Sequence, residues 1–202
     1  LGDATQSVNP YTSSNAEQIR QSLPSATSVK LTKSYRSTWE IMRFALAISP
    51  NPELEAMKRH GQAPQVHVCK RPAQMTAGIA DEIAAFKASD HQSLAIIAKT
   101  QKQAAKLHKA LVEGGCEARL LDGESAGFST GAIVCTAHLA KGLEFDRVIV
   151  TDVSASNYLT EMDRNLLYVA CTRAMHHLTL YAVGVPTDWL PMTEDANTNR
   201  PL

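Results

Sequence analysis

The chain has 202 residues, and its 20 lysine and arginine residues are balanced by 20 aspartate and glutamate residues. Hydrophobic residues make up 44% and charged residues 20%, which excludes a disordered protein and fits a globular domain. This balance gives no global basic field that would indicate nucleic acid binding, although a groove can still be locally basic. No apolar run approaches the roughly 18 residues needed to span a membrane, so we expect no membrane partner.

The opening of the chain and its cysteines indicate a cytoplasmic setting. The chain starts at Leu1 without a signal-peptide pattern, as expected of a segment cut from a longer protein. The four cysteines are far apart and form no CxxC pair, and Cys135 and Cys171 lie in apolar segments. We therefore expect buried thiols in a reducing compartment, without disulfides or a metal site.

The elements expected in chain order alternate between strands and helices. The first 28 residues are polar and rich in turn formers. The run at 93–99 is continuously apolar, which predicts a strand buried on both faces. Thr100 is the expected N-cap of the helix that follows, and Gly114 and Gly115 are its expected end. Helices are predicted at 38–48, 53–60, 73–88, 100–115 and 161–174, and strands at 65–70, 93–99, 117–122, 132–138, 147–153 and 178–184.

This alternation predicts an α/β fold of three layers with a mostly parallel sheet. Ligands on such sheets usually bind at the carboxyl ends of the strands. The P-loop pattern GxxxxGK[ST] is absent, and no Gly-Lys dipeptide occurs in the sequence. The chain therefore lacks the usual means of cradling nucleotide phosphates by itself.

The first segment with candidate functional residues is CTAHLAKGLEFDRVIV (135–150), a polar loop between two predicted strands. Thr136 and His138 are suited to phosphate or base contacts, and a carboxylate such as Glu144 is suited to sugar hydroxyls. Glycine after Lys141 lets the backbone approach a ligand closely. Taken alone, the segment also fits an ordinary solvated loop.

The second segment is LTKSYRST (31–38), which precedes a predicted helix. Ser37 or Thr38 is the expected cap of that helix. Tyr35 is suited to stacking on a base and Arg36 to pairing with phosphate. The alternative is an exposed arginine at the start of a helix.

The third segment is NLLYVACTRA (165–174), an apolar helix that ends on Arg173 with no carboxylate nearby in sequence. One explanation is a favourable interaction with the helix dipole, worth about 0.3–1 kcal/mol. The other is an arginine finger, which stabilises the transferring γ-phosphoryl group and accelerates hydrolysis by roughly 10³–10⁵.

Taken together and in this order, these segments resemble the C-terminal half of a superfamily 1 helicase of the UvrD/Rep type. The resemblance covers nearly the whole chain, and its last two motifs are the most specific. The matching stretches are LGDATQS (1–7, motif III), LTKSYRST (motif IV), TAHLAKGLEFDRVIV (motif V) and LLYVACTRA (motif VI).

The resemblance implies a RecA-like domain of the P-loop NTPase type, called 2A in these helicases. Residues 1–28 would be the tail of the upstream RecA-like domain 1A with its linker, residues 29–190 domain 2A, and residues 191–202 a flexible tail. Only 97 residues (39–135) separate motif IV from motif V, so a full 2B insertion does not fit. This departure resembles the HelD, or helicase IV-like, branch of the family.

The resemblance also implies a role for each matching residue. Gln6 would sense the γ-phosphate, while Arg36 and Arg173 would be arginine fingers. The residues implied to hold the nucleotide are Tyr35 on adenine, Gly142 at the loop backbone and Glu144 on ribose. The residues implied to contact single-stranded nucleic acid are Thr136, His138 and Lys141.

The cofactors implied are ATP and Mg²⁺, with the P-loop and the magnesium ligands expected in the upstream 1A domain. The resulting hypothesis is an ATP-dependent DNA helicase or translocase that acts on single-stranded DNA. The alternative is a HelD-like ATPase that binds and recycles RNA polymerase, and a third possibility is a non-catalytic interaction module. His176 and His177 are expected to be a strand-start pair rather than metal ligands.

Overall fold

The computed structural model describes residues 33–34, 36–51, 54–56, 59–122 and 130–191. Gln6, Tyr35, the predicted 1A tail and most of the predicted C-terminal tail lie outside the described residues. The elements in chain order are β1 (Lys33–Ser34), α2 (Trp39–Ile48), β2 (Glu55–Ala56), β3 (Gln65–Cys69), α3 (Pro72–Lys87), β4 (Ser93–Ala98), α4 (Gln101–Glu113), β5 (Arg119–Leu120), β6 (Gly131–Thr136), α5 (Ala137–Ala140), β7 (Phe145–Val150), α6 (Glu161–Cys171) and β8 (Ala174–Val183).

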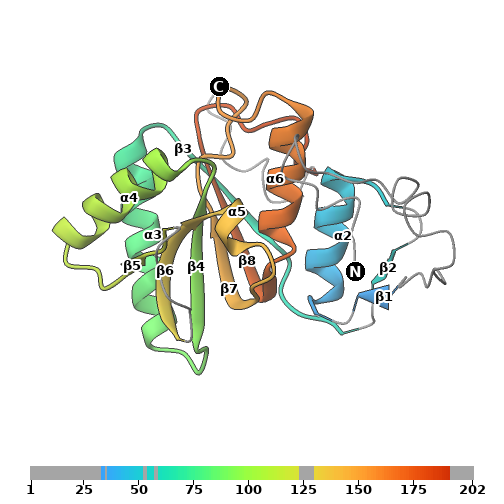
Figure 1. Ribbon diagram of the computed structural model, residues 1–202, viewed down its shortest axis with the longest axis horizontal. Coiled ribbons are helices and arrows are strands. Elements are labelled where there is room, and N and C mark those ends of the chain that lie inside the picture. The colour runs from blue at the N-terminus through green and yellow to red at the C-terminus, as the bar shows by residue number, and fades with distance from the viewer. Residues whose placement is uncertain (1–32, 35, 52–53, 57–58, 123–129, 192–202) are drawn as a thin grey trace, which may run out of the picture.

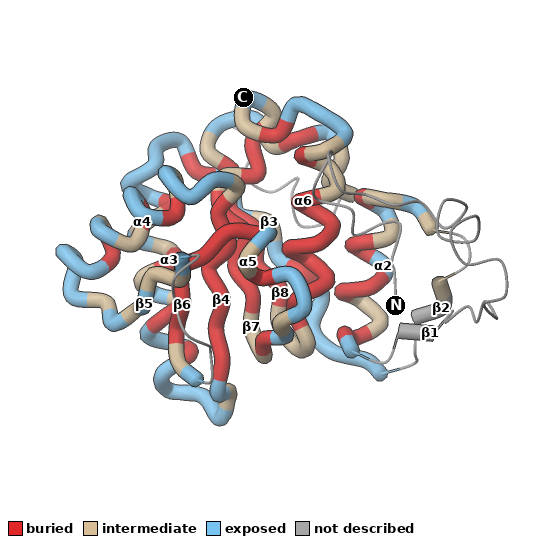
Figure 2. The backbone as a smooth tube through the Cα atoms, in the orientation of Figure 1, coloured by how far each residue is buried: buried red, intermediate tan, exposed pale blue. Residues whose placement is uncertain are grey.

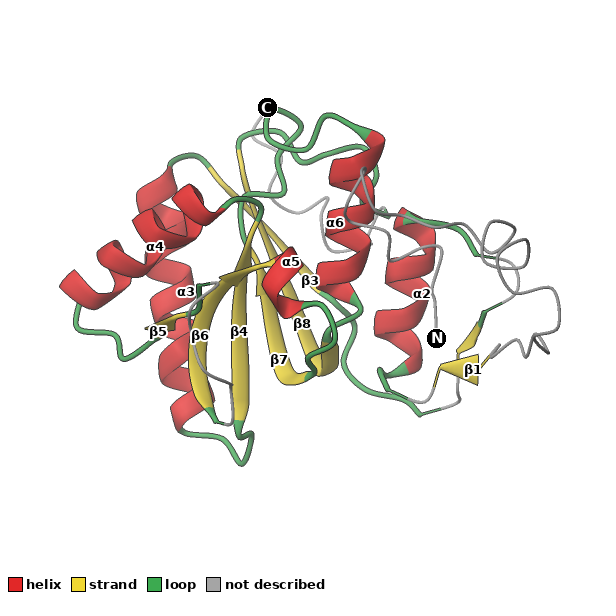
Figure 3. Ribbon diagram, in the orientation of Figure 1, coloured by secondary structure: helices red, strands yellow, loops and turns green. Residues whose placement is uncertain are grey.

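A six-stranded sheet in the order β3-β8-β7-β4-β6-β5 forms the centre of the molecule (Figure 1). Every neighbouring pair in it is parallel. Helices flank the sheet on both sides (Figure 3). The predicted three-layer α/β fold with a mostly parallel sheet is therefore confirmed.

The central strand β4 shows how the sequence builds two cores on one sheet. All six of its residues are buried, as its continuous apolar run predicts. Ala95 and Ile97 pack into the core under α2, α5 and α6. Leu94 and Ile96 pack on the other face into the core under α3 and α4. Figure 2 shows the buried strands at the centre of the molecule, with many exposed residues along α3 and α4 and mostly buried ones along α6.

The prediction of a helix at 53–60 is wrong. In the described part of this stretch, Glu55 and Ala56 form β2, which pairs in parallel with β1. An isolated helix of eight residues gains little stability in water, and β1 offers the backbone a hydrogen-bonding partner instead. Further along the chain, Arg59 and Gly61 form hydrogen bonds with the first residues of α2.

Several predicted boundaries also move. The strand predicted at 117–122 is reduced to Arg119–Leu120, and β6 ends at Thr136, where α5 begins. The helix predicted to reach 174 ends at Cys171. Strand β8 begins at Ala174 rather than at 178, because its first residues pair with the start of β7. His176 and His177 thus lie near the start of a strand, as predicted.

The predicted N-cap positions of α2 and α4 are confirmed, but only the cap of α4 makes the expected capping hydrogen bond. Thr100 caps α4 by accepting a hydrogen bond from the Gln103 amide at 3.2 Å. Thr38 is at the N-cap of α2 but makes no capping bond, and its buried hydroxyl has no hydrogen-bond partner among the described residues. The Trp39 amide instead donates to the Arg59 carbonyl at 2.8 Å, so the loop after β2 replaces the cap.

All four cysteines are free thiols, in agreement with the sequence. Cys135 and Cys171 are fully buried. Burial raises the pKa of Cys135 to about 12 and raises that of Cys171 as well. Both thiols are therefore protonated and unreactive at neutral pH. Within the described ranges, no helix is long and apolar enough to cross a membrane.

We predict that Gly78→Ala destabilises the fold, contrary to the usual gain of about 0.5–1 kcal/mol for this change inside a helix. A Cβ at Gly78 in α3 would lie 2.8 Å from Cε1 and Oη of Tyr181 in β8, and this tyrosine is buried. Overpacking of this kind costs roughly 1–3 kcal/mol, which lowers the Tm by about 2–4 °C per kcal/mol. Thermal unfolding measured by circular dichroism provides the test.

The matched control is the same change in a Tyr181→Leu background. Removing the ring relieves the contact, so the second substitution should then cost much less. An equal loss in both backgrounds would contradict the steric explanation.

Candidate functional site

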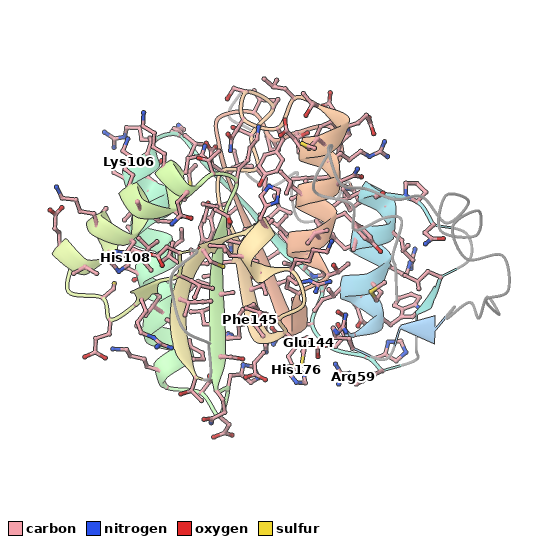
Figure 4. All side chains as sticks on the ribbon, in the orientation of Figure 1. Arg59, Lys106, His108, Glu144, Phe145 and His176 are labelled. Carbon is pink, nitrogen blue, oxygen red and sulfur yellow. The ribbon has the colours of Figure 1, made fainter. Side chains whose placement is uncertain are left out.

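Three segments that are far apart in sequence meet at the amino ends of β7 and β8. The Phe145 amide donates to the Arg173 carbonyl at 3.0 Å, and the Thr38 amide donates to the Met175 carbonyl at 3.3 Å. Figure 4 labels Glu144, Phe145 and His176 together at this end of the sheet. The converging segments are 36–38, 143–145 and 173–175, and each contains or adjoins a residue predicted for the nucleotide site.

Arg36 and Glu144 form an ion pair between Nε of the guanidinium and Oε1 of the carboxylate. The two side chains are 42% and 40% exposed, so the pair lies at the surface. A pair exposed to this degree contributes about 0–1 kcal/mol, because water screens the attraction. Two predicted site residues are thus in contact, and the contact is weak enough to be exchanged for another charged partner.

Arg173 lies in the turn between α6 and β8 and is 1% exposed. Its Nε donates to the Val169 carbonyl at 3.1 Å, and its Nη1 donates to the Leu143 carbonyl at 3.4 Å. Its Nη2 contacts the Thr172 hydroxyl at 3.2 Å. The bond to the last turn of α6 agrees with the helix-terminus explanation. The bond to Leu143 places the guanidinium against the backbone of the residue that precedes Glu144.

Arg59 also belongs to this cluster, and the sequence reasoning missed it. Its Nη2 donates to the carbonyls of Arg36 and Met175. The residue was hidden within the helix wrongly predicted at 53–60. Gly61 gave no signal against that helix, because a glycine directly after a predicted helix is typical of a normal helix end.

The residues predicted to contact nucleic acid lie in and after α5. Thr136 ends β6, is buried, and accepts the Leu139 amide at 3.4 Å, so its hydroxyl caps α5. His138 and Lys141 are exposed. Gly142 has a φ of +86°, a left-handed conformation that side chains other than glycine rarely adopt, and open space surrounds it. In this structure Thr136 therefore positions α5, whereas His138 and Lys141 are accessible.

The candidate residues divide between two edges of the sheet. Thr136 is at the carboxyl end of β6, whereas Glu144 and Arg173 precede the amino ends of β7 and β8. We expected a ligand site at the carboxyl ends of the strands, but the arginines gather at the opposite edge of the sheet. The amino ends of parallel strands also share one edge, and the loops that lead into β7 and β8 meet there.

The carboxyl end of the central strand is filled by an internal ion pair. Lys99, which follows β4, lies 2.8 Å from Oδ1 of Asp163 and also donates to the Asn157 carbonyl. Burial acts to raise the pKa of Asp163, but hydrogen bonds from Lys99 and from the Leu159 and Thr160 amides hold it below its usual value. The lysine after this strand is thus held by the protein itself.

Three histidines cluster at the amino edge beside the arginines. The ring of His91 lies 5.5 Å from that of His176 and 4.9 Å from that of His177. Burial and the charge of Arg147 lower the pKa of His177 to about 4, and the same causes lower the pKa of His91. Among the described residues, no group of three or more histidine, cysteine or acidic side chains has a geometry suited to a metal ion.

Comparison with known proteins identifies the class to which this arrangement belongs. Residues 131–181 match the family of UvrD-like helicase C-terminal domains. The crystal structure of the C-terminal domain of a possible DNA helicase from Lactobacillus plantarum WCFS1 is similar, with a TM-score of 0.69 and 37% sequence identity. The match covers 81% of this chain and 96% of that one. The chain therefore belongs to the family of UvrD-like helicase C-terminal domains.

A second relative is F-box DNA helicase protein 1 of Schizosaccharomyces pombe, 41% identical over 78 residues. The match covers 32% of this chain and only 9% of that protein. The resemblance to UvrD-type helicases and the RecA-like fold are confirmed. The assignment to the HelD branch stays a prediction, and because one relative is eukaryotic the similarity does not single out bacteria.

The histidine cluster leads to a prediction about pH. An unfolded histidine titrates near pH 6.5, whereas folded His177 has a pKa of about 4. Between these pH values the histidine is protonated in the unfolded chain but neutral in the folded domain. The free energy of unfolding is therefore highest above pH 6.5 and decreases as the pH drops toward 4. After a discount for partial exposure, we expect a loss of about 1 kcal/mol at pH 5, which lowers the Tm by about 2–4 °C.

The measurement is a series of thermal unfolding curves between pH 7.5 and pH 5. His177→Gln should flatten the decrease in Tm, and His138→Gln, which changes an exposed histidine outside the cluster, should not. A wild-type slope in His177→Gln would rule out this residue as the source.

Proposed function

We propose that this chain is the second RecA-like domain, 2A, of an ATP-dependent superfamily 1 DNA helicase or translocase. The observation that supports it best is the convergence of Arg36, Glu144 and Arg173 at the amino ends of β7 and β8. Each comes from a different helicase motif of the sequence. Two guanidinium groups and a carboxylate within one cluster match the chemistry of a nucleoside triphosphate, which offers phosphate oxygens and ribose hydroxyls.

In this proposal, ATP binds between this domain and an upstream 1A domain, with Tyr35 against adenine and Glu144 on ribose. Closure of the two domains lets Arg36 exchange its exposed partner Glu144 for a γ-phosphate oxygen. The exchange costs little, because a surface ion pair is replaced by a charge-assisted contact with phosphate. The positive charge then stabilises the transferring phosphoryl group.

Arg173 acts as the second finger after a small rotation. Its bond to the Leu143 carbonyl, at 3.4 Å, is near the limit for a hydrogen bond and is the longest of the three given above. Rotation replaces this long contact with one to a phosphate oxygen, while the bond from Nε to Val169 keeps the guanidinium on the end of α6. Because Arg173 is buried in this domain, its guanidinium meets the γ-phosphate only when the two domains close.

The magnesium ion that accompanies ATP is proposed to bind outside this domain. The described residues hold no suitable cluster of ligands, and the carboxylate of Glu144 is engaged by Arg36. The P-loop and the acidic metal ligands are therefore assigned to the 1A domain. Gln6, which lies outside the described residues, would couple that site to this one.

Single-stranded DNA is proposed to pass over α5 and the turn after it. His138 and Lys141 are exposed there, and Gly142 leaves the backbone open to a phosphate or sugar. Thr136 holds α5 in place through its capping bond. The same polypeptide links α5 to Glu144 at the start of β7, so opening and closing at the ATP site would move the DNA-binding turn.

A HelD-like ATPase that recycles RNA polymerase is the second candidate. It is favoured by one observation, namely that the described part of residues 39–135 forms α2 to β6 of this domain and leaves no room for a large insertion. The ATP site would be the same in both cases. The two candidates differ in what stimulates hydrolysis.

We predict that Arg36→Ala and Arg173→Ala each reduce kcat for ATP hydrolysis by the full-length protein, on the order of 10³-fold. Nucleotide binding, measured by equilibrium titration, should change much less, because a finger acts mainly in the transition state. Arg43→Ala serves as a control, since Arg43 is exposed on α2 and its guanidinium stacks on Trp39. An unchanged kcat in Arg36→Ala would show that Arg36 is not an arginine finger.

We further predict that single-stranded DNA stimulates hydrolysis and that Lys141→Ala weakens this effect. Loss of one phosphate contact should raise the DNA concentration for half-maximal stimulation several-fold and reduce the slope of its salt dependence by about 0.7. Lys106→Ala on α4 provides a control with an equal change in charge. Stimulation by RNA polymerase alone would instead select the recycling ATPase.

A further inference from the structure

The loop residues 59–61 join the start of α2 to the start of β8. One guanidinium nitrogen of Arg59, Nη2, donates to the carbonyl of Arg36 and to that of Met175, the latter at 3.0 Å. The carbonyl of Arg59 accepts the Trp39 amide at 2.8 Å. Arg59 thus bonds the residues on both sides of the α2 N-terminus and the strand that follows Arg173.

The loop also contacts Glu40 and Thr38 at the start of α2. Glu40 accepts the Gly61 amide at 2.8 Å with one carboxylate oxygen and contacts Nδ1 of His60 at 2.8 Å with the other. Gly61 packs so closely on Thr38 that an added Cβ would lie 2.5 Å from Cγ2 of that buried side chain. These contacts position the backbone of Arg59, so that its guanidinium reaches the carbonyls of Arg36 and Met175.

We propose that Arg59 is a positioning residue that fixes the backbone of Arg36 for its contact with ATP. This inference rests on the proposed function of Arg36. The Arg36 side chain extends from the backbone toward Glu144, and its reach depends on where the carbonyl of the same residue is held. Arg59 holds that carbonyl against β8, so the guanidinium of Arg36 moves with the strand that begins next to Arg173.

The alternative is that Arg59 only stabilises the fold. The Met175 carbonyl also accepts the Thr38 amide, and Ser37 donates to the Ala174 carbonyl at 2.6 Å. The segment would therefore stay attached to β8 without Arg59. What is lost is the constraint on the Arg36 carbonyl, and a misplacement of about 1 Å at a catalytic group can cost on the order of 10²-fold in rate.

The test is a double-mutant cycle in the full-length protein, with kcat and KM for ATP measured at saturating single-stranded DNA. Arg59→Ala should lower kcat by about 10–100-fold and change KM by less than about threefold. Arg59→Lys should recover part of the rate, because an ammonium group can still donate to both carbonyls. In an Arg36→Ala background, Arg59→Ala should have almost no further effect.

Arg43→Ala is the control for removing an exposed arginine near α2, and thermal unfolding shows whether each variant is folded. Where Arg59→Ala fails to fold, Arg59→Lys and its combination with Arg36→Ala carry the test. A rate for Arg59→Ala equal to that of Arg43→Ala overturns the inference. Additive losses in the double variant also overturn it, because Arg59 would then act independently of Arg36. A normal rate in Arg36→Ala contradicts the proposed function itself.

Discussion

The candidate site depends on the pairing between the amino ends of β7 and β8. There the Phe145 amide donates to the Arg173 carbonyl at 3.0 Å, after which the register of the two strands shifts between Phe145 and Arg147. This contact places the loop before β7, which carries Glu144, directly beside the turn before β8, which carries Arg173. The N-terminal segment of α2 then docks on the same edge through Met175. Without that pairing, Arg36, Glu144 and Arg173 would not lie at the same edge of the sheet.

Helix α6 connects this edge to the opposite one. Its first turn is held by the capping box of Thr160 and Asp163 and by the ion pair from Lys99 at the end of the central strand. Its last turn offers the Val169 carbonyl to Arg173. The two side chains of the ion pair are 19% and 9% exposed, so removing one of them would leave a largely buried charge and loosen the start of the helix. A rigid α6 therefore relates the position of Arg173 to the carboxyl ends of β4 and β7.

The fold could be predicted from the sequence because its strongest signals are local. The apolar run at 93–99 and the cap at Thr100 predict a buried strand followed by a helix, and both are present as β4 and α4. The ordered motifs indicated the family. The bonds of Arg59 could not be predicted, because they join positions 36, 59 and 175, which are far apart in sequence. The helix predicted at 53–60 also left out the pairing of β2 with β1. The inward direction of Arg173 also escaped prediction, since sequence does not reveal that carbonyls of Val169 and Leu143 surround it.

The exposed ion pair between Arg36 and Glu144 is well suited to a site that binds and releases a charged ligand. In the proposed function each group has a nucleotide partner of its own, phosphate for the cation and ribose for the carboxylate. Until ATP arrives, each neutralises the other, so the edge carries no unbalanced charge from these two groups. Their exposure keeps the pair weak, which means that a phosphate can displace the carboxylate at little cost. A buried version of the same pair would be costly to break and would hold Arg36 away from the nucleotide.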